Sequence, residues 1–302
     1  MKSTLWTILC LVALFTGSCQ KEASFKQDND PPAIDPPAVS DTILSAENGG
    51  LLRRMVLQYE GEQDSMVFAF KYDGNGKLVE LYGVNEGPAD ADDNLFSLLQ
   101  QFDRNANGVA QKIKIVSYLY YGANNPQLHW SANYDVHYDE TTSRYTYALM
   151  TGTGESEPLN DSIAYSYASN GLINVVAEYH LEPNDTAQLD DKFEYTYDAN
   201  GRISVQKATS VRNYPNREDW FINQFEYDAK VNPMNFGQEL LLTGELVISS
   251  PTPNNITRCT NAINSEESYT VQYTYNDSNK PKTAEWQYNS GEKATMKYYY
   301  QN

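Results

Sequence analysis

Residues 192–206, which read KFEYTYDANGRISVQ, give the clearest indication of the fold of this chain. Aromatic residues alternate with polar ones before the DANGR segment, and Ile203 and Val205 alternate with polar ones after it. A period of two is typical of a half-buried β-strand. Asp198 followed by Gly201 is typical of a type I turn in which the glycine takes a left-handed conformation. The stretch therefore predicts a β-hairpin.

The same phrase recurs along the chain. It reads FKYDGNGKL from Phe70, YSYASNGLI from Tyr165, YTYDANGRI from Tyr195, FEYDAKVNP from Phe225 and YTYNDSNKP from Tyr273. The second, third and fourth copies begin 30 residues apart, and a fixed period of this size indicates one supersecondary unit copied along the chain. We therefore expect a single all-β domain at residues 46–302, an antiparallel meander of repeated hairpins that forms one twisted or curled sheet.

Two features depart from this rhythm. Residues 92–102 have an acidic start and apolar residues at nearly helical spacing, which predicts a short helical insertion. Pro233 and Pro281 occur in the last two copies and predict altered loops there.

The recurring pattern Y-x-Y-D-x-x-G-[KR]-[LI] resembles the YD repeat of Rhs-type proteins. The further phrases YDAKVNP at Tyr227 and PNNIT at Pro253 are similar to those of uncharacterised Bacteroidota outer-membrane lipoproteins with degenerate YD-like repeats. This resemblance covers roughly residues 50–300. It implies a β-repeat fold and gives almost no information about activity. Large Rhs proteins use many repeats to form a closed shell around a cargo, and this chain has too few copies to form such a shell.

Residues 1–18 predict an export signal. Lys2 is followed by an apolar run at residues 5–15 and by small residues that directly precede Cys19. The run is shorter than the about 20 residues that a membrane-spanning helix needs. A cysteine at this place resembles the acylated cysteine of bacterial lipoproteins, which implies a lipid anchor in the outer membrane. An ordinary secretory signal cut near Ser18 is the alternative.

Residues 19–45 begin with the lipidated cysteine and continue as a tether. The segment has few aromatic residues and contains two Pro-Pro pairs, a composition typical of disorder. Residues 20–22 (QKE) resemble the short signals that send such lipoproteins to the cell surface. We therefore favour the cell surface over the periplasmic face of the outer membrane.

The acidic composition excludes some partners. The chain has 40 acidic against 22 basic residues and a net charge of −18, which disfavours nucleic acid because binding it depends on neutralising phosphates. Cys259 is the remaining cysteine once Cys10 and Cys19 are set aside, so we expect it to be a buried small apolar residue. No motif for a cofactor occurs in the sequence.

Three sets of residues are candidate sites, each with a plainer explanation. Asp103, Asn105 and Asn107 match the start of a calcium loop, although Lys114 stands where the loop needs a glutamate, and a hairpin turn explains the same residues. A further set follows an Asp, as in Bacteroidota O-glycosylation signals, or consists of ordinary surface residues: Thr42, Ser65, Ser162 and Thr186.

The third set is Trp130, Trp220 and Trp286, which provide stacking platforms for sugar rings or else cover the sheet. His129, His137 and His180 lack the spacing of a zinc site or a catalytic triad.

The sequence as a whole predicts a non-catalytic outer-membrane lipoprotein that acts as a binding or scaffold module for a glycan or an envelope protein. One alternative is a polysaccharide hydrolase, which needs two carboxylates about 5 to 10 Å apart across a cleft. The other is a structural spacer or adhesin.

Overall fold

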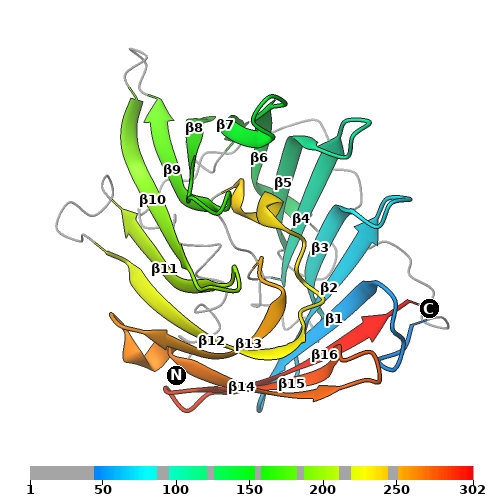
Figure 1. Cartoon of the computed structure of the whole chain (residues 1–302). Coiled ribbons are helices and arrows are strands. Elements are labelled where there is room, and N and C mark those ends of the chain that lie inside the picture. The colour runs from blue at the N-terminus through cyan, green and yellow to red at the C-terminus, as the bar shows by residue number, and fades with distance from the viewer. Residues whose placement is uncertain are drawn as a thin grey trace, which may run out of the picture.

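A computed structural model describes residues 44–86, 95–120, 126–153, 158–181, 187–210, 219–243 and 251–301. These residues form a closed antiparallel β-barrel of 16 strands (Figure 1). The strands are β1 (Leu52–Tyr59), β2 (Ser65–Tyr72), β3 (Leu78–Glu86), β4 (Leu95–Arg104), β5 (Ala110–Tyr120), β6 (Pro126–Asp139), β7 (Arg144–Thr153), β8 (Pro158–Tyr167), β9 (Ile173–Leu181), β10 (Ala187–Tyr197), β11 (Ile203–Ser210), β12 (Phe221–Val231), β13 (Asn254–Asn261), β14 (Tyr269–Tyr275), β15 (Pro281–Tyr288) and β16 (Lys293–Tyr300).

Helical structure in the described residues is limited to two 3₁₀ helices, η2 (Gln238–Leu241) and η3 (Ser265–Glu267). Neither they nor any other described segment form a helix long and apolar enough to cross a membrane.

The expectation of one open, twisted or curled sheet is wrong, because the first and last strands pair with each other. Leu52 lies opposite Tyr300 and Met55 lies opposite Tyr298, and Figure 1 shows β1 in blue beside β16 in red. An open sheet would leave two edge strands with unpaired backbone groups. Closure removes both edges.

The hairpins themselves form as predicted. β10 and β11 pair through Phe193 with Ala208 and Tyr195 with Gln206, and a bulge follows at the turn. Gly201 has a φ of 74°, the left-handed conformation that the turn requires. The copy at residues 273–281 keeps the same turn, because Asn279 takes a φ of 58° in place of the glycine. Pro281 begins β15 and leaves that loop unaltered, contrary to expectation.

The predicted helical insertion at residues 92–102 is also wrong, because its described part belongs to strand β4, which pairs with β3 and β5. Leu98 and Phe102 face the core cluster of the barrel. Leu99 points to the other side, where it lies opposite Tyr82 and Val116. Apolar residues on both faces of one strand reproduce the spacing of a helix, and this misled the prediction.

The second tyrosine and the basic residue of the repeat connect neighbouring copies. The Tyr197 hydroxyl donates to the Ile173 carbonyl at 2.5 Å, and the Tyr227 hydroxyl donates to the Ile203 carbonyl at 2.6 Å. The Arg202 guanidinium lies 5.0 Å from the ring centre of Tyr227 in the next copy, a cation–π contact. The motif therefore encodes contacts between adjacent hairpins as well as the hairpin turn.

Most of the buried side chains inside the barrel are apolar. Residues that lie opposite one another in neighbouring strands point to the same face, and one such series runs from Tyr298 through Met55 and Phe68 to Gly83. The buried side chains of this face form one core cluster, together with Leu240, Leu241 and Leu242 from the connection between β12 and β13. Figure 1 shows this yellow-orange connection inside the ring of strands. The clustered face is therefore the inner one.

Most of the outer face is polar. Lys192 and Glu194 on β10 lie opposite Thr209 and Lys207 on β11, and all four alternate with core residues. The outer face of β2–β5 is the exception, with a row formed by Ala69, Tyr82, Leu99 and Val116. A barrel that spans a membrane needs an apolar outer band around its whole circumference. Lys192, Glu194 and Lys207 interrupt any such band at β10 and β11.

The β12–β13 connection folds into the barrel at the end that carries the repeat turns. We call residues 232–243 the inner plug. The Glu239 carboxylate accepts from Tyr145 and pairs with Arg104, both at 2.5 Å, and the Tyr165 hydroxyl donates to the Leu242 carbonyl at 2.6 Å. Leu241 and Leu242 are fully buried. The plug thus occupies the interior at this end, and the altered loop that Pro233 predicts is confirmed.

Candidate functional site

Two places in the barrel bring together side chains suited to recognition. One is a groove on the outer face of β1 and β14–β16, and the other is an acidic region of the inner wall at β8–β11. We describe the outer groove first.

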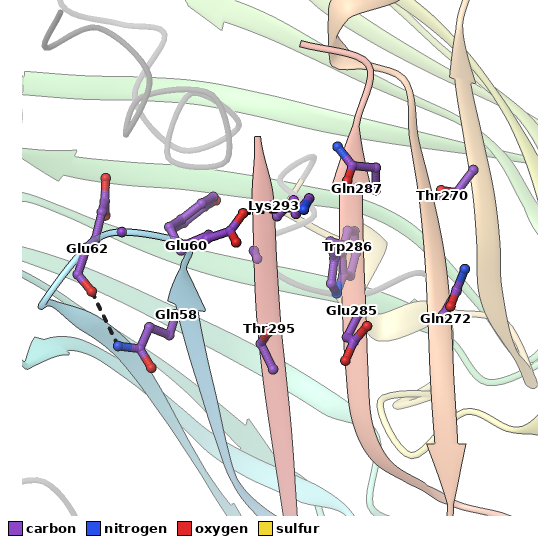
Figure 2. A pocket seen from close by; sticks show the side chains of 13 residues that line it. Gln58, Glu60, Glu62, Thr270, Gln272, Glu285, Trp286, Gln287, Lys293 and Thr295 are labelled. Carbon is purple, nitrogen blue, oxygen red and sulfur yellow. Dashed lines mark hydrogen bonds and ion pairs between the residues drawn. The ribbon is translucent and has the colours of Figure 1, made fainter. Parts of the chain in front are cut away.

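Strands β14–β16 and β1 form the outer groove, which has a volume of about 650 Å³. Its labelled side chains come from neighbouring strands and from the β1–β2 turn (Figure 2). Strand register aligns four of them in one row across the strands: Gln272, Glu285, Thr295 and Gln58. A second row runs from Thr270 through Gln287 to Lys293. Alternation along each strand places both rows outward, since Val271, Ala284 and Ala294 face the core.

The groove offers amides, hydroxyls and carboxylates to a ligand. Gln272, Glu285 and Gln287 are exposed, while the Gln58 amide donates to the Glu62 carbonyl at 3.4 Å. Lys293 and Glu60 form an exposed ion pair at 3.6 Å. The pKa of Glu62 is raised by burial and by the nearby carboxylates of Asp64 and Glu292. The groove is therefore rich in hydrogen-bond acceptors and carries excess negative charge at its rim.

The second place is the inner acidic cluster, defined by Asp161, Glu178, His180, Asp191 and Ser210. Asp161 on β8 lies opposite His180 on β9, and Glu178 on β9 lies opposite Asp191 on β10. Asp191 in turn lies opposite Ser210 on β11. These positions alternate with outward ones and share the face of Ile163, Phe193 and Ala208 in the core cluster. The strands thus gather the five side chains on one patch of inner wall.

The cluster has few neutralising groups. His180 Nδ1 lies 2.7 Å from Asp161 Oδ1, and Asp161 and Asp191 are 7 % and 3 % exposed. Burial raises the pKa of Asp191 to about 6, and the charges of Asp190 and Asp161 add to this rise. The Ser210 hydroxyl moderates the rise, although neither its oxygen nor Asp191 Oδ1 makes a hydrogen bond of ordinary geometry.

Sequence reasoning missed this cluster, yet a signal for it is present. Asp161 precedes Ile163 and Tyr165 at alternate positions, and Asp191 precedes Phe193 and Tyr195 in the same way. An acidic residue in register with the buried face of a strand is costly unless it is used. The alternation of Asp161 and Asp191 with buried residues is therefore a sequence signal that both carboxylates lie on the inner face.

The three tryptophans are separated and half-buried. Trp130 lies on β6, Trp220 lies just before β12, and Trp286 lies on β15. All three pack against the core cluster, and only Trp286 also borders the outer groove. Its ring centre lies 4.7 Å from that of Tyr269. Trp286 lies opposite Val271 and Ala294, which face the core, so its ring points to the inner face and away from the two outward rows of the groove. A role of the tryptophans in sugar stacking stays a prediction.

The calcium-loop residues form the β4–β5 turn. Asn105 Oδ1 accepts from the backbone N–H groups of Asn107 and Val109. The Gly108 carbonyl accepts from Lys77 Nζ at 2.7 Å and from Arg104 at 3.1 Å, and Asp103 lies opposite Lys112. No group of three or more His, Cys, Asp or Glu side chains in the described residues is arranged to hold a metal. The neighbouring positive charges favour the turn explanation.

The other candidates fall in different places. Ser65 begins β2 and Ser162 faces outward on β8, both half-buried. Thr42, Thr186 and Cys19 lie outside the described residues. Cys259 is buried and unpaired, and burial raises the pKa of its thiol to about 12. His137 stacks on Tyr147 on the outer face, far in register from the inward His180.

No protein-family model and no curated protein matches the sequence. Two solved structures are similar in fold. One is a porin-like protein from Bacteroides uniformis, with a TM-score of 0.50 and 13 % identity over 82 % of this chain and 95 % of that one. The other is a porin-like protein from Bacteroides vulgatus, with a TM-score of 0.35 and 14 % identity over 83 % of this chain and 99 % of that one. The first similarity is one of fold, and it places this chain among the large antiparallel β-barrels.

Proposed function

We propose that this protein is a non-catalytic binding module, anchored in the outer membrane through a lipidated Cys19, whose outer groove binds a glycan of the cell envelope or surface. The groove carries the proposal. Its exposed amides, hydroxyls and carboxylates are the groups that hydrogen-bond sugar hydroxyls.

The charge pattern of the barrel supports attachment by an anchor. The structural neighbour from Bacteroides uniformis is described as porin-like. In this chain the ion pair Lys192–Glu194 and the exposed pair Arg258–Glu226 lie on outward faces, where a spanning barrel would meet lipid. Charged residues on a lipid-facing strand cost several kcal/mol at the bilayer midplane, about 2–4 for a basic residue. A lipid on Cys19 holds such a barrel at the membrane without inserting it.

The anchor is tested by expressing Cys19→Ala beside the natural chain. We expect the variant to appear in the soluble envelope fraction and the natural chain in the outer-membrane fraction, where protease added to intact cells digests it. The purified domain without its lipid should stay soluble without detergent and should produce no channel conductance across planar bilayers. A detergent requirement together with channel conductance would contradict the proposal.

Glycan binding is tested on an array with the mature protein, followed by titration of the best ligand. The double variant Gln272→Ala/Glu285→Ala removes two adjacent groups of the groove. We expect it to weaken binding at least tenfold. Gln224→Ala is the matched control, since Gln224 is an exposed amide on the outer face of β12. Equal binding by all three proteins would remove the groove from consideration.

One observation favours a second candidate, a hydrolase acting on polysaccharide. Burial raises the pKa of Asp191 to about 6, and the negative charge of Asp161 contributes to the rise. A raised carboxyl pKa is typical of a general acid. The same array ligands decide the matter. A hydrolase releases shorter sugars from them and loses that activity in Asp191→Asn, whereas a binding module leaves them intact.

A further inference from the structure

The outer groove has a layout that fits a linear ligand lying across the strands. One row of polar side chains crosses four neighbouring strands, with one residue on each: Gln272, Glu285, Thr295 and Gln58. Neighbouring strands lie about 4.8 Å apart, so the row is about 14 Å long. This is the length of a short oligosaccharide rather than of a single sugar ring.

A second row runs beside the first and gives the ligand partners on its other side. Thr270 stands two residues before Gln272 on β14, and Gln287 stands two residues after Glu285 on β15 (Figure 2). Two residues of a strand span about 7 Å. Within the described part of the chain, neither the Gln272 amide nor the Glu285 carboxylate has a hydrogen-bond or ion-pair partner. Both groups are therefore available to a ligand.

The lining of the groove is negatively charged. It includes Glu60, Glu62 and Glu285, against Lys293 as a basic residue, and Lys293 pairs with Glu60 at 3.6 Å. Burial and the negative charge of Asp64 raise the pKa of Glu62, so the neighbour of this carboxylate is another acid. The lining therefore leaves the charges of Glu62 and Glu285 without a matching cation.

Two further basic residues lie near the groove but do not line it. Arg258 lies opposite Thr270 and pairs with Glu226 at 3.5 Å. Lys297 stands two residues after Thr295 on β16. A negatively charged sugar in the groove would therefore lie against carboxylates. A sugar ammonium group would instead form charge-assisted hydrogen bonds, which are roughly twice as strong as neutral ones.

We propose that the outer groove selects a linear oligosaccharide that carries free amino groups. The Glu285 carboxylate accepts from a sugar ammonium group, and the amides of Gln272 and Gln287 bond the neighbouring hydroxyls. The inference rests on the proposed function of the groove and names the class of glycan, an amino-sugar chain in place of a neutral or an acidic one.

The test is calorimetric titration of the mature protein with three tetrasaccharides, of glucosamine, of N-acetylglucosamine and of galacturonic acid. The first two share one backbone and differ in charge. The titration is made at about pH 6, where the sugar amines are protonated, and at about 150 mM salt, which screens charges beyond about 8 Å. We expect the glucosamine tetramer to bind at least tenfold more tightly than the other two, and more tightly than free glucosamine.

The variant Glu285→Gln keeps the size of the side chain and removes its charge. We expect it to weaken binding of the glucosamine tetramer at least tenfold and to leave binding of the N-acetylated tetramer nearly unchanged. Asp135→Asn is the matched control, since Asp135 is an exposed, outward aspartate on β6, across the ring of strands from β14–β16 in Figure 1. It should bind like the natural protein. Thermal melting shows that each variant is folded.

The outcomes separate this inference from the proposed function. Equal losses in Glu285→Gln and Asp135→Asn would mean that the general acidity of the chain attracts the amino sugar, and the inference would fail. Tighter binding of the N-acetylated or the acidic tetramer, abolished by Gln272→Ala/Glu285→Ala, would overturn the inference and leave the groove as a glycan site. Absence of binding by all three tetramers would overturn the inference, and an array without ligands would overturn the proposed function as well.

Discussion

The inner plug and the inner acidic cluster lie inside the same barrel but differ in how well the hydrogen-bonding capacity of their buried carboxylates is satisfied. In the plug, Glu239 is matched by the Arg104 guanidinium and the Tyr145 hydroxyl, and the Gln238 amide contacts the Ile173 N–H and the Tyr197 hydroxyl. In the cluster, Asp191 Oδ1 and Ser210 Oγ have no such partners. A satisfied polar network stabilises one structure, whereas an unsatisfied one costs free energy. The polar contacts of the plug therefore add stability, whereas the buried Asp191 carboxyl lowers it.

The largest effect should come from breaking the plug. Glu239→Ala leaves Arg104 buried without its carboxylate and removes the acceptor of the Tyr145 hydroxyl. Arg104 keeps the carbonyls of Leu78 and Gly108, so we expect a loss of about 3 kcal/mol in the free energy of unfolding. Denaturant unfolding measures it.

The control for this variant is Glu226→Ala, which breaks an ion pair whose partners are both exposed. Such pairs contribute about 0–1 kcal/mol. Equal losses in the two variants would mean that the plug contributes no more to stability than a surface contact.

The second-largest effect should be a gain in folding stability, on replacement of Asp191. Burial raises the pKa of Asp191 from 3.8 to about 6, so the folded protein loses stability as the pH rises from about 4 to about 6. The penalty is complete at pH 7 and amounts to about 3 kcal/mol or less. Asp191→Asn should therefore stabilise the protein at pH 7 and have little effect at pH 3.5.

Melting temperatures across this pH range measure the difference between Asp191→Asn and the natural protein. Other ionisable side chains lie close to Asp191, so the comparison uses the difference between the two curves. A variant less stable than the natural chain at pH 7 would show that Asp191 is a structural residue, and the contrast with the plug would fail.

The smallest effect concerns the cation–π contact between two adjacent repeats. Arg202→Ala removes the cation–π contact with Tyr227 and the partly exposed ion pair with Asp198. We expect a loss of about 1 kcal/mol, measured by denaturant unfolding. Lys297→Ala, an exposed outward residue on β16, should change stability less. A loss in Arg202→Ala as large as that in Glu239→Ala would place the repeat contacts beside the plug in importance.

Local rules explain why the hairpins were predictable. Alternation in residues 192–206 and the left-handed glycine of the turn are properties of a few consecutive residues. The burial of Cys259 was predicted on another ground, because a free cysteine usually behaves as a small apolar residue. The β4 segment failed because Leu99 belongs to an apolar outer row whose other members come from β2, β3 and β5.

The sequence by itself determined the antiparallel hairpins, the alternation of apolar and polar faces and the acidic character of the chain, because each depends on near neighbours or on composition. Tertiary structure decided the closure of β1 on β16, the insertion of the inner plug and the meeting of Asp161, Glu178 and Asp191. Closure depends on how many strands curl and at what tilt, and one repeat is compatible with an open sheet or a barrel. The plug contacts strands far from it in the sequence, through Arg104 on β4 and Tyr145 on β7. The cluster comes from the consecutive strands β8–β11, and their register places its side chains on one face of the wall.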